Sequence, residues 1–179
     1  MINSIEVVNG MMGADEMLYI KKVLFCTDFS SNAQFAFQFA LSEASRFSKC
    51  TLHLLHVIPE VEAQFWKTYL YEIDGIDEKA KQDMQTKINE DYLSYIPEQI
   101  SFHVEIRMGK DYQTILEYAK EIDSDLIVIG RQGQSNLRKV LFGNVTEKVT
   151  RHAECPVLVI PLVYQTKKRP DPSVQEKGD

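Results

Sequence analysis

The sequence DLIVIGRQG, at positions 125–133, decides the fold class of this chain. Residues 126–129 form a short run of branched apolar side chains, a pattern typical of a strand buried on both faces of a parallel sheet. Residues 130–133 follow at once as a tight turn that is flanked by two glycines, which permit close approach of a ligand to the backbone. The pattern predicts a buried strand that ends in a glycine-rich turn.

Similar strands and helices alternate along the rest of the chain. Apolar runs predict five strands, at residues 22–27, 51–57, 101–108, 125–130 and 155–161. Helical spacing and helix-start chemistry predict helices at residues 33–47, 80–95, 111–122 and 144–152, with Asp111 as a cap. This alternation implies right-handed crossovers, and we therefore predict a doubly wound α/β fold with a five-stranded parallel sheet.

The bulk composition limits the class of protein. A chain of 179 residues fits one domain, and its formal net charge of −6 argues against nucleic acid as the main partner. A nucleotide stays compatible with this charge, because backbone amides and one or two cations can hold a small anion.

The cysteines and the apolar runs predict a cytoplasmic protein. Cys26, Cys50 and Cys155 are odd in number and widely spaced, which favours reduced thiols. No apolar run approaches the ~18 residues of a membrane span, and residues 1–17 lack the basic start and apolar core of a signal peptide. We therefore expect no membrane partner.

A ligand is expected where the strands end, because open α/β sheets bind their ligands beyond the carboxyl ends of the strands. The predicted strand ends carry Thr27-Asp28, His56-Val57 and the glycine turn at 130–133. Ten residues after that turn, Gly143 opens the last predicted helix. A helix start offers unpaired N–H groups and a positive dipole end, which together suit a phosphate.

The spacing Gly130-x2-Gly133-x9-Gly143, followed by residues 145–149 and 155–159, resembles the nucleotide-binding signature of the universal stress proteins. Residues 23–30 and 55–57 resemble the first strand and the second strand end of the same family. The resemblance extends from about residue 21 to residue 161. It implies the strand order 3-2-1-4-5 and a universal stress protein domain at 20–163, between an extension at 1–19 and a disordered polar tail at 164–179.

The resemblance also implies where an adenine nucleotide lies. The adenosine end is expected near Thr27, Asp28 and Val57, and the phosphates near the three glycines and the residue after the last. The full set of predicted nucleotide-binding residues is Thr27, Asp28, Val57, Gly130, Arg131, Gly133, Gly143, Asn144, Val145 and Thr146. The expected ligand is ATP, with any Mg²⁺ carried by the nucleotide.

Asn144 departs from the family pattern, which usually has Ser or Thr at this position. An asparagine can cap a helix without any ligand role, or its amide can donate to a phosphate. Asp28 has the same two readings, as a nucleotide contact or as a cap of the first helix. Arg131 either neutralises phosphate charge or is only solvated.

The sequence predicts a binding module and not an efficient enzyme. No nucleophile, base and orienting group can be assembled from it, and the four histidines lack metal-ligand spacing, so at most slow ATP hydrolysis is expected. We predict a stress-responsive regulatory protein that forms a homodimer through the edge strand at 156–161. The alternative is a nucleotide-free dimeric interaction module of the same fold.

Overall fold

The computed structural model describes residues 19–60, 76–132 and 143–162, with residues 76–81 described by their backbone alone. Its centre is one parallel sheet with the strand order β3-β2-β1-β4-β5. The strands are β1 (Lys22–Thr27), β2 (Thr51–Pro59), β3 (Ser101–Gly109), β4 (Leu126–Gly130) and β5 (Val157–Ile160). The predicted fold class and strand order are confirmed.

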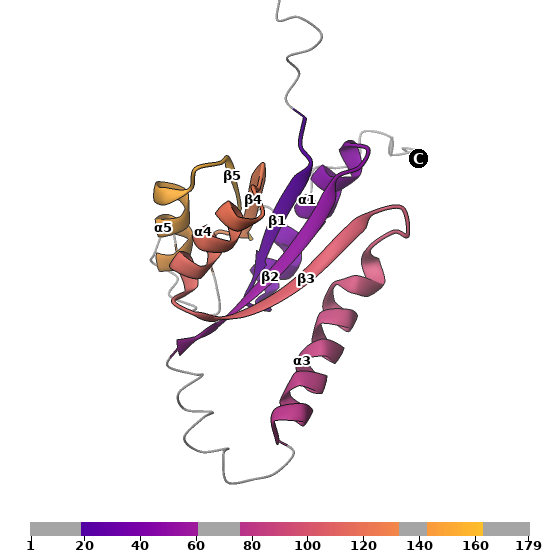
Figure 1. Ribbon diagram of the computed structural model, residues 1–179, viewed down its shortest axis with the longest axis vertical. Helices are drawn as coiled ribbons and strands as arrows, with labels where there is room; N and C mark the ends of the chain where they lie inside the picture. The colour runs from indigo at the N-terminus through magenta and orange to yellow at the C-terminus, as the bar shows by residue number, and fades with distance from the viewer. Residues whose placement is uncertain (1–18, 61–75, 133–142, 163–179) are drawn as a thin grey trace, which may run out of the picture.

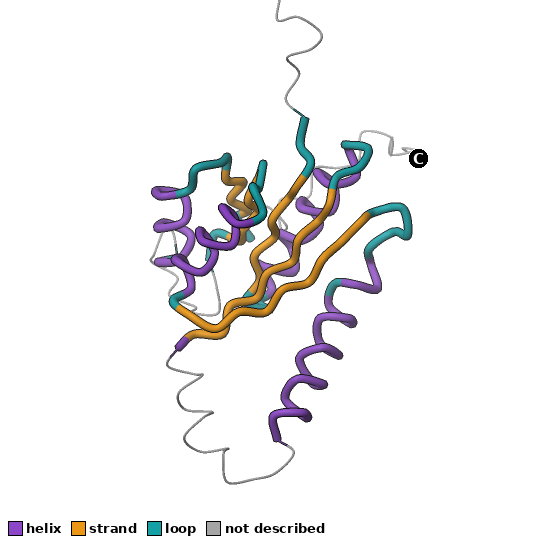
Figure 2. The backbone as a smooth tube through the Cα atoms, in the orientation of Figure 1, coloured by secondary structure: helices purple, strands orange, loops and turns teal. Residues whose placement is uncertain are grey.

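Helices cover both faces of this sheet (Figures 1 and 2). They are α1 (Ser31–Arg46), α3 (Ile76–Asp91), the 3₁₀ turn η2 (Leu93–Tyr95), α4 (Asp111–Glu121) and α5 (Asn144–His152). The first core cluster joins α1 to one face of the sheet, and the second joins α4 and α5 to the opposite face. None of the helices within the described ranges has the length and apolar character needed to cross a membrane.

Strand β1 lies at the centre and supplies both cores. Val23 and Phe25 belong to the cluster under α1, whereas Leu24 and Cys26 belong to the cluster under α4 and α5. Successive side chains of a strand point to opposite faces, so a strand covered on both sides must be apolar at every position. This explains why the sequence of β1 is a continuous run and not an alternation.

Tyr92, between α3 and η2, packs into the core cluster under α1 and so holds the end of α3 against it. It is fully buried, and its ring centroid lies 5.4 Å from that of Phe25 and 5.0 Å from that of Phe37. A buried phenol needs a hydrogen-bond partner. The hydroxyl of Tyr92 finds one in Thr27 Oγ1, at 2.5 Å, at the end of β1.

Two local predictions need correction. The helix predicted at 80–95 starts at Ile76 and ends at Asp91, and a separate 3₁₀ turn follows. The cap of α4 is Lys110, which caps by its backbone conformation alone, so that Asp111 becomes the first helical residue. Gly109 ends β3, and a Cβ at this position would collide with the hydroxyl of Thr114.

The predicted extension up to residue 18 and the tail at 164–179 lie outside the described residues.

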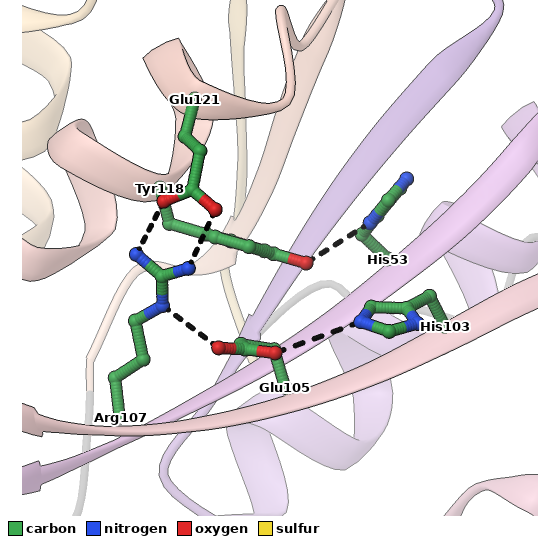
Figure 3. A network of polar contacts seen from close by, with 6 residues as sticks. All are labelled: His53, His103, Glu105, Arg107, Tyr118 and Glu121. Atoms are coloured by element: carbon green, nitrogen blue, oxygen red, sulfur yellow. Dashed lines mark hydrogen bonds and ion pairs between the residues drawn. The ribbon is translucent and has the colours of Figure 1, made fainter.

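A polar network joins the edge strand β3 to helix α4 (Figure 3). The guanidinium of Arg107 lies 4.3 Å from the ring centroid of Tyr118 and makes two bonds to the Glu121 carboxylate, at 2.8 and 2.9 Å. Its Nε donates to Glu105, at 2.9 Å. The charges on the edge strand and the helix thus hold the last part of α4 against β3.

His53 lies at the buried end of the same network. Its Nδ1 is 3.1 Å from the hydroxyl of Tyr118, and its ring centroid is 5.6 Å from that of His103 on the neighbouring strand. Burial lowers the pKa of His53, and the nearby His103 and Lys22 lower it further. The folded protein therefore holds His53 in its neutral form.

This arrangement predicts a loss of stability in mild acid. Because the pKa of His53 is lower in the folded chain than its ordinary value of 6.5, the unfolded chain binds the proton more readily. The free energy of unfolding should fall as the pH drops below about 6.5. His53→Gln, which keeps a partner for Tyr118, should reduce this slope in urea titrations between pH 7 and pH 5.

The exposed His152 provides the matched control. His152→Gln should leave the slope unchanged. An equal slope in the native chain and in His53→Gln would contradict the assignment of the acid sensitivity to this network.

Candidate functional site

The carboxyl end of β1 is a tight turn organised by the buried Thr27. Its Oγ1 accepts a hydrogen bond from the backbone N–H of Phe29 at 2.9 Å and pairs with the hydroxyl of Tyr92. Phe29 has a φ of 60°, in the left-handed region that side chains rarely adopt. Backbone strain of this kind persists only where the surroundings enforce it, and here Thr27 enforces it.

Asp28 lies in this turn, but the structure gives the cap of α1 to Ser30. The Oγ of Ser30 accepts from the backbone N–H of Ala33 at 3.2 Å. Asp28 Oδ1 accepts from the backbone N–H of Ser30 at 3.0 Å, so it shapes the turn that precedes the helix. The reading of Asp28 as the cap of the first helix is therefore wrong.

His56 joins the end of β2 to this turn. Its Nδ1 lies 2.8 Å from the carbonyl oxygen of Thr27. A carbonyl can only accept, so Nδ1 carries the proton and Nε2 of the neutral ring is an acceptor. Its ring centroid is 4.6 Å from that of Phe29. Val57, the next residue, is partly buried and packs against the core under α4 and α5.

Asn32 is the residue that sequence reasoning missed at the end of β4. It is 3% exposed, its Nδ2 donates to the carbonyl of Ile160 at 2.9 Å, and its Oδ1 accepts from the backbone N–H of Gln132 at 3.0 Å. The sequence places it only among helix-start residues. Its role depends on strands far along the chain, so no local signal marks it.

Gly130 lies directly against Asn32. A Cβ on Gly130 would lie 3.1 Å from the Cγ of Asn32 and 3.3 Å from its backbone carbon. Such contacts are tighter than side chains normally accept. The glycine at this position therefore permits the end of β4 and the start of α1 to pack together.

The start of α5 is bound to the end of β4 by two hydrogen bonds. The hydroxyl of Thr146 donates to the carbonyl of Gly130 at 2.9 Å, and the backbone N–H of Gly143 donates to the carbonyl of Arg131 at 2.9 Å. Thr146 is buried, so its side chain positions the helix. Gly143 is the N-cap of α5 and has no side chain that can accept from the first N–H groups of the helix.

Asn144 is the first residue of α5 and is exposed, so the reading of Asn144 as the helix cap is wrong. Val145 follows in the first turn and is partly buried. The first three N–H groups of an α-helix have no partner within the helix. The N–H groups of Asn144, Val145 and Thr146 thus lie at the start of α5, beside the end of β4.

Arg131 lies between the end of β4 and the start of α5. Its backbone N–H donates to the carbonyl of Ile160 at 2.8 Å. Within the described ranges, its Nε is buried and has no hydrogen-bond partner. A guanidinium N–H in this state can donate to an anion. Gly133, the remaining predicted site residue, lies outside the described residues.

The described part of the site therefore consists of two neighbouring halves. One half, formed by β4 and α5, presents backbone N–H groups and Arg131; we call it the cradle. The other half lies at the ends of β1 and β2 and carries Asp28, His56 and Val57. Across residues 19–60, 76–132 and 143–162, no group of three or more metal-ligating side chains occurs.

Comparison with known proteins gives one consistent result. The model of the universal stress protein family matches residues 20–161. The universal stress protein MJ0577 of Methanocaldococcus jannaschii is 29% identical over 153 residues, which cover 78% of this chain and 94% of that protein. Its solved structure superposes with a TM-score of 0.66 over 80% of this chain and 97% of that chain.

Two further solved structures share the fold at lower identity. A universal stress protein from Archaeoglobus fulgidus in complex with dAMP is 23% identical, with a TM-score of 0.52 over 80% of this chain and 99% of that chain. A universal stress protein in complex with cAMP is 19% identical, with a TM-score of 0.53 over 80% of this chain and 98% of that chain.

Replacement of Asn32 tests how much the site depends on this side chain. Asn32→Ala removes the two hydrogen bonds to Ile160 and Gln132, each worth about 0.5–1.5 kcal/mol, so we expect the free energy of unfolding to fall by about 1–3 kcal/mol. Ser31→Ala, at an exposed position in the same turn, should change it by less than about 0.5 kcal/mol. Equal effects in urea denaturation would show that Asn32 has no special role.

Proposed function

The chain belongs to the universal stress protein family, and on that basis we propose that it binds an adenine nucleotide at the carboxyl ends of β1, β2 and β4. The observation that carries the proposal is the side-chain-free cap at Gly143, fixed beside Gly130 by the hydroxyl of Thr146. Anions bind at such helix starts because unpaired N–H groups and the helix dipole act together.

The cradle is the proposed phosphate site. The N–H groups of Asn144, Val145 and Thr146 belong to the first turn of α5. Arg131 supplies a cation whose buried Nε finds no hydrogen-bond partner among the residues that the structure describes. Arg131 would pair with phosphate oxygens directly. The side chain of Thr146 takes no part, because it already donates to Gly130.

The turn at the end of β1 is the proposed nucleoside site. Asp28 follows β1, and His56 and Val57 lie near the end of β2, so all three lie on the opposite side of β4 from β5. Thr27 contributes indirectly, since its hydroxyl is engaged with Phe29 and Tyr92. The dAMP and cAMP complexes of proteins with this fold support an adenine nucleotide as the ligand class. We propose ATP, with any Mg²⁺ carried by the nucleotide.

We further propose a regulatory binding role and not efficient catalysis. Glu147, the acidic residue in the first turn of α5, forms an ion pair with Arg151 at 2.8 Å. The imidazole of His56 lies at the end of β2, two strands away from the cradle, and donates to Thr27. This distribution favours a nucleotide that is held and released over one that is rapidly hydrolysed. A cytoplasmic location stays a prediction from the sequence.

Backbone donors can be tested separately from the Asn144 side chain. Asn144→Pro removes one N–H from the first helical position, where proline is well tolerated, and the extended backbone of Gly143 before it (φ −65°, ψ 148°) suits a following proline. By calorimetry, we expect Asn144→Pro to weaken binding of Mg-ATP by about tenfold or more, since hydrogen bonds to charged groups are strong.

Asn144→Ala is the matched control, because it removes the side chain and keeps the N–H. Its affinity should stay within a few-fold of the native value. Equal weakening in both variants would show that the side-chain amide of Asn144, and not its backbone N–H, contacts the nucleotide. Absence of any heat from native, nucleotide-free protein at millimolar Mg-ATP would overturn the proposal and favour the nucleotide-free interaction module.

We also propose a homodimer formed through β5. This strand is the last of the sheet, its described backbone pairs only with β4, and Val157, Leu158 and Val159 are partly exposed. Strand edges of this kind favour antiparallel pairing about a two-fold axis. Light scattering at micromolar concentration should give twice the chain mass of 20.6 kDa. Val159→Pro, which cannot donate to an added strand, should give the monomer mass.

A further inference from the structure

We propose that Asp111 selects a purine that carries an amino group at position 6, such as adenine, over one that carries an oxygen there. The inference rests on the proposed nucleotide site and names the residue that would read the base. The sequence assigns Asp111 only to the cap of α4, but the structure shows Lys110 in that position.

The backbone places Asp111 at the strand ends. It is the first residue of α4, which follows β3 directly, and α4 packs on the same core as Leu55 and Val57 of β2. Figure 1 shows the chain turning from the end of β3 into α4 close to the tip of β2. The close approach of Thr114 to Gly109 fixes this turn.

The carboxyl group of Asp111 has a vacant acceptor. Within the described ranges, its Oδ1 is buried and has no hydrogen-bond partner. Burial raises the pKa of this carboxyl; its own backbone N–H and the nearby His56 lower it, and Asp28 raises it. The carboxyl therefore lies within electrostatic range of two side chains in the proposed nucleoside site. A buried acceptor without a partner is costly, and a ligand that donates to it would remove that cost.

The strand order indicates which part of a nucleotide reaches Asp111. The cradle lies at the end of β4, and β1 separates β4 from β2. Neighbouring strands are about 4.8 Å apart, so the end of β2 lies about 10 Å from the cradle. A nucleotide with its phosphates in the cradle extends across β1, and its base is the part farthest from the phosphates. The base therefore comes to the side of the site where Asp111 lies.

The hydrogen-bonding character of the Asp111 carboxylate and of the group at position 6 of the purine then decides which base is preferred. An ionised carboxylate only accepts hydrogen bonds. The amino group of adenine donates, whereas the oxygen at the same position of hypoxanthine or guanine only accepts and would face the carboxylate with lone pairs. Sites built to bond a polar group discriminate strongly against analogues that lack the matching donor.

The test compares affinities for ATP and inosine triphosphate by calorimetry on the full chain. The two bases differ at position 6, which carries an amino group or an oxygen, and at the adjacent N1, which is an acceptor in adenine and a donor in hypoxanthine. The native protein should prefer ATP by about tenfold or more. Asp111→Asn supplies an amide that donates to the oxygen, so it should reduce or reverse this ratio. Asp83→Asn, at an exposed position of α3, is the control and should keep the native ratio. Circular dichroism melts confirm that each variant is folded.

The outcomes separate this inference from the proposed function. Binding of ATP with the same ATP-to-inosine ratio in the native protein and in Asp111→Asn would overturn the role of Asp111 and leave the nucleotide site standing. A change only in the ratio of ATP to 2′-deoxy-ATP would place the carboxyl on the sugar and also overturn it. No binding of any nucleotide would overturn both.

Discussion

The amide of Asn32 is the interaction on which the geometry of the site depends. One side chain, at the start of α1, donates to the end of β5 and accepts from the segment after β4. Both bonds are possible because Gly130 leaves room for the amide. Once the end of β4 is fixed in this way, its carbonyl at Gly130 can accept from Thr146 and hold the start of α5 in place.

The two halves of the site use different physical means. The cradle relies on backbone groups, whose positions follow from the strand order and from the hydrogen bonds around Gly130. The proposed nucleoside half relies on Thr27, Phe29 and His56, which hold one another through hydrogen bonds and ring contacts. Backbone donors recognise phosphate with little regard to the base, so the proposed site can distinguish bases only through its second half.

The sequence predicts the fold well because each strand of a covered parallel sheet is apolar at every position, and β1 and β4 show this directly. It also predicts that Gly130 ends a strand and that Gly143 opens the last helix, because the residues beside each glycine show these boundaries. It does not predict the bonds of Asn32 or the use of the Thr146 hydroxyl, because these depend on which strand ends become neighbours. The caps at Asp111 and Asn144 were wrong because Lys110 and Gly143 cap by backbone conformation, which no side chain signals.

The bond from Asn32 to Ile160 joins residues 128 positions apart, near the two limits of the folded domain. Contacts of such long range form late, because the intervening chain must first be brought into order. During synthesis the helix α1 leaves the ribosome long before β5 exists. The side-chain amide of Asn32 therefore bonds to water until almost the whole domain has been made. A truncated chain that ends before β5 would lack the bond from Asn32 to Ile160, and with it a formed cradle, even if its first strands had folded.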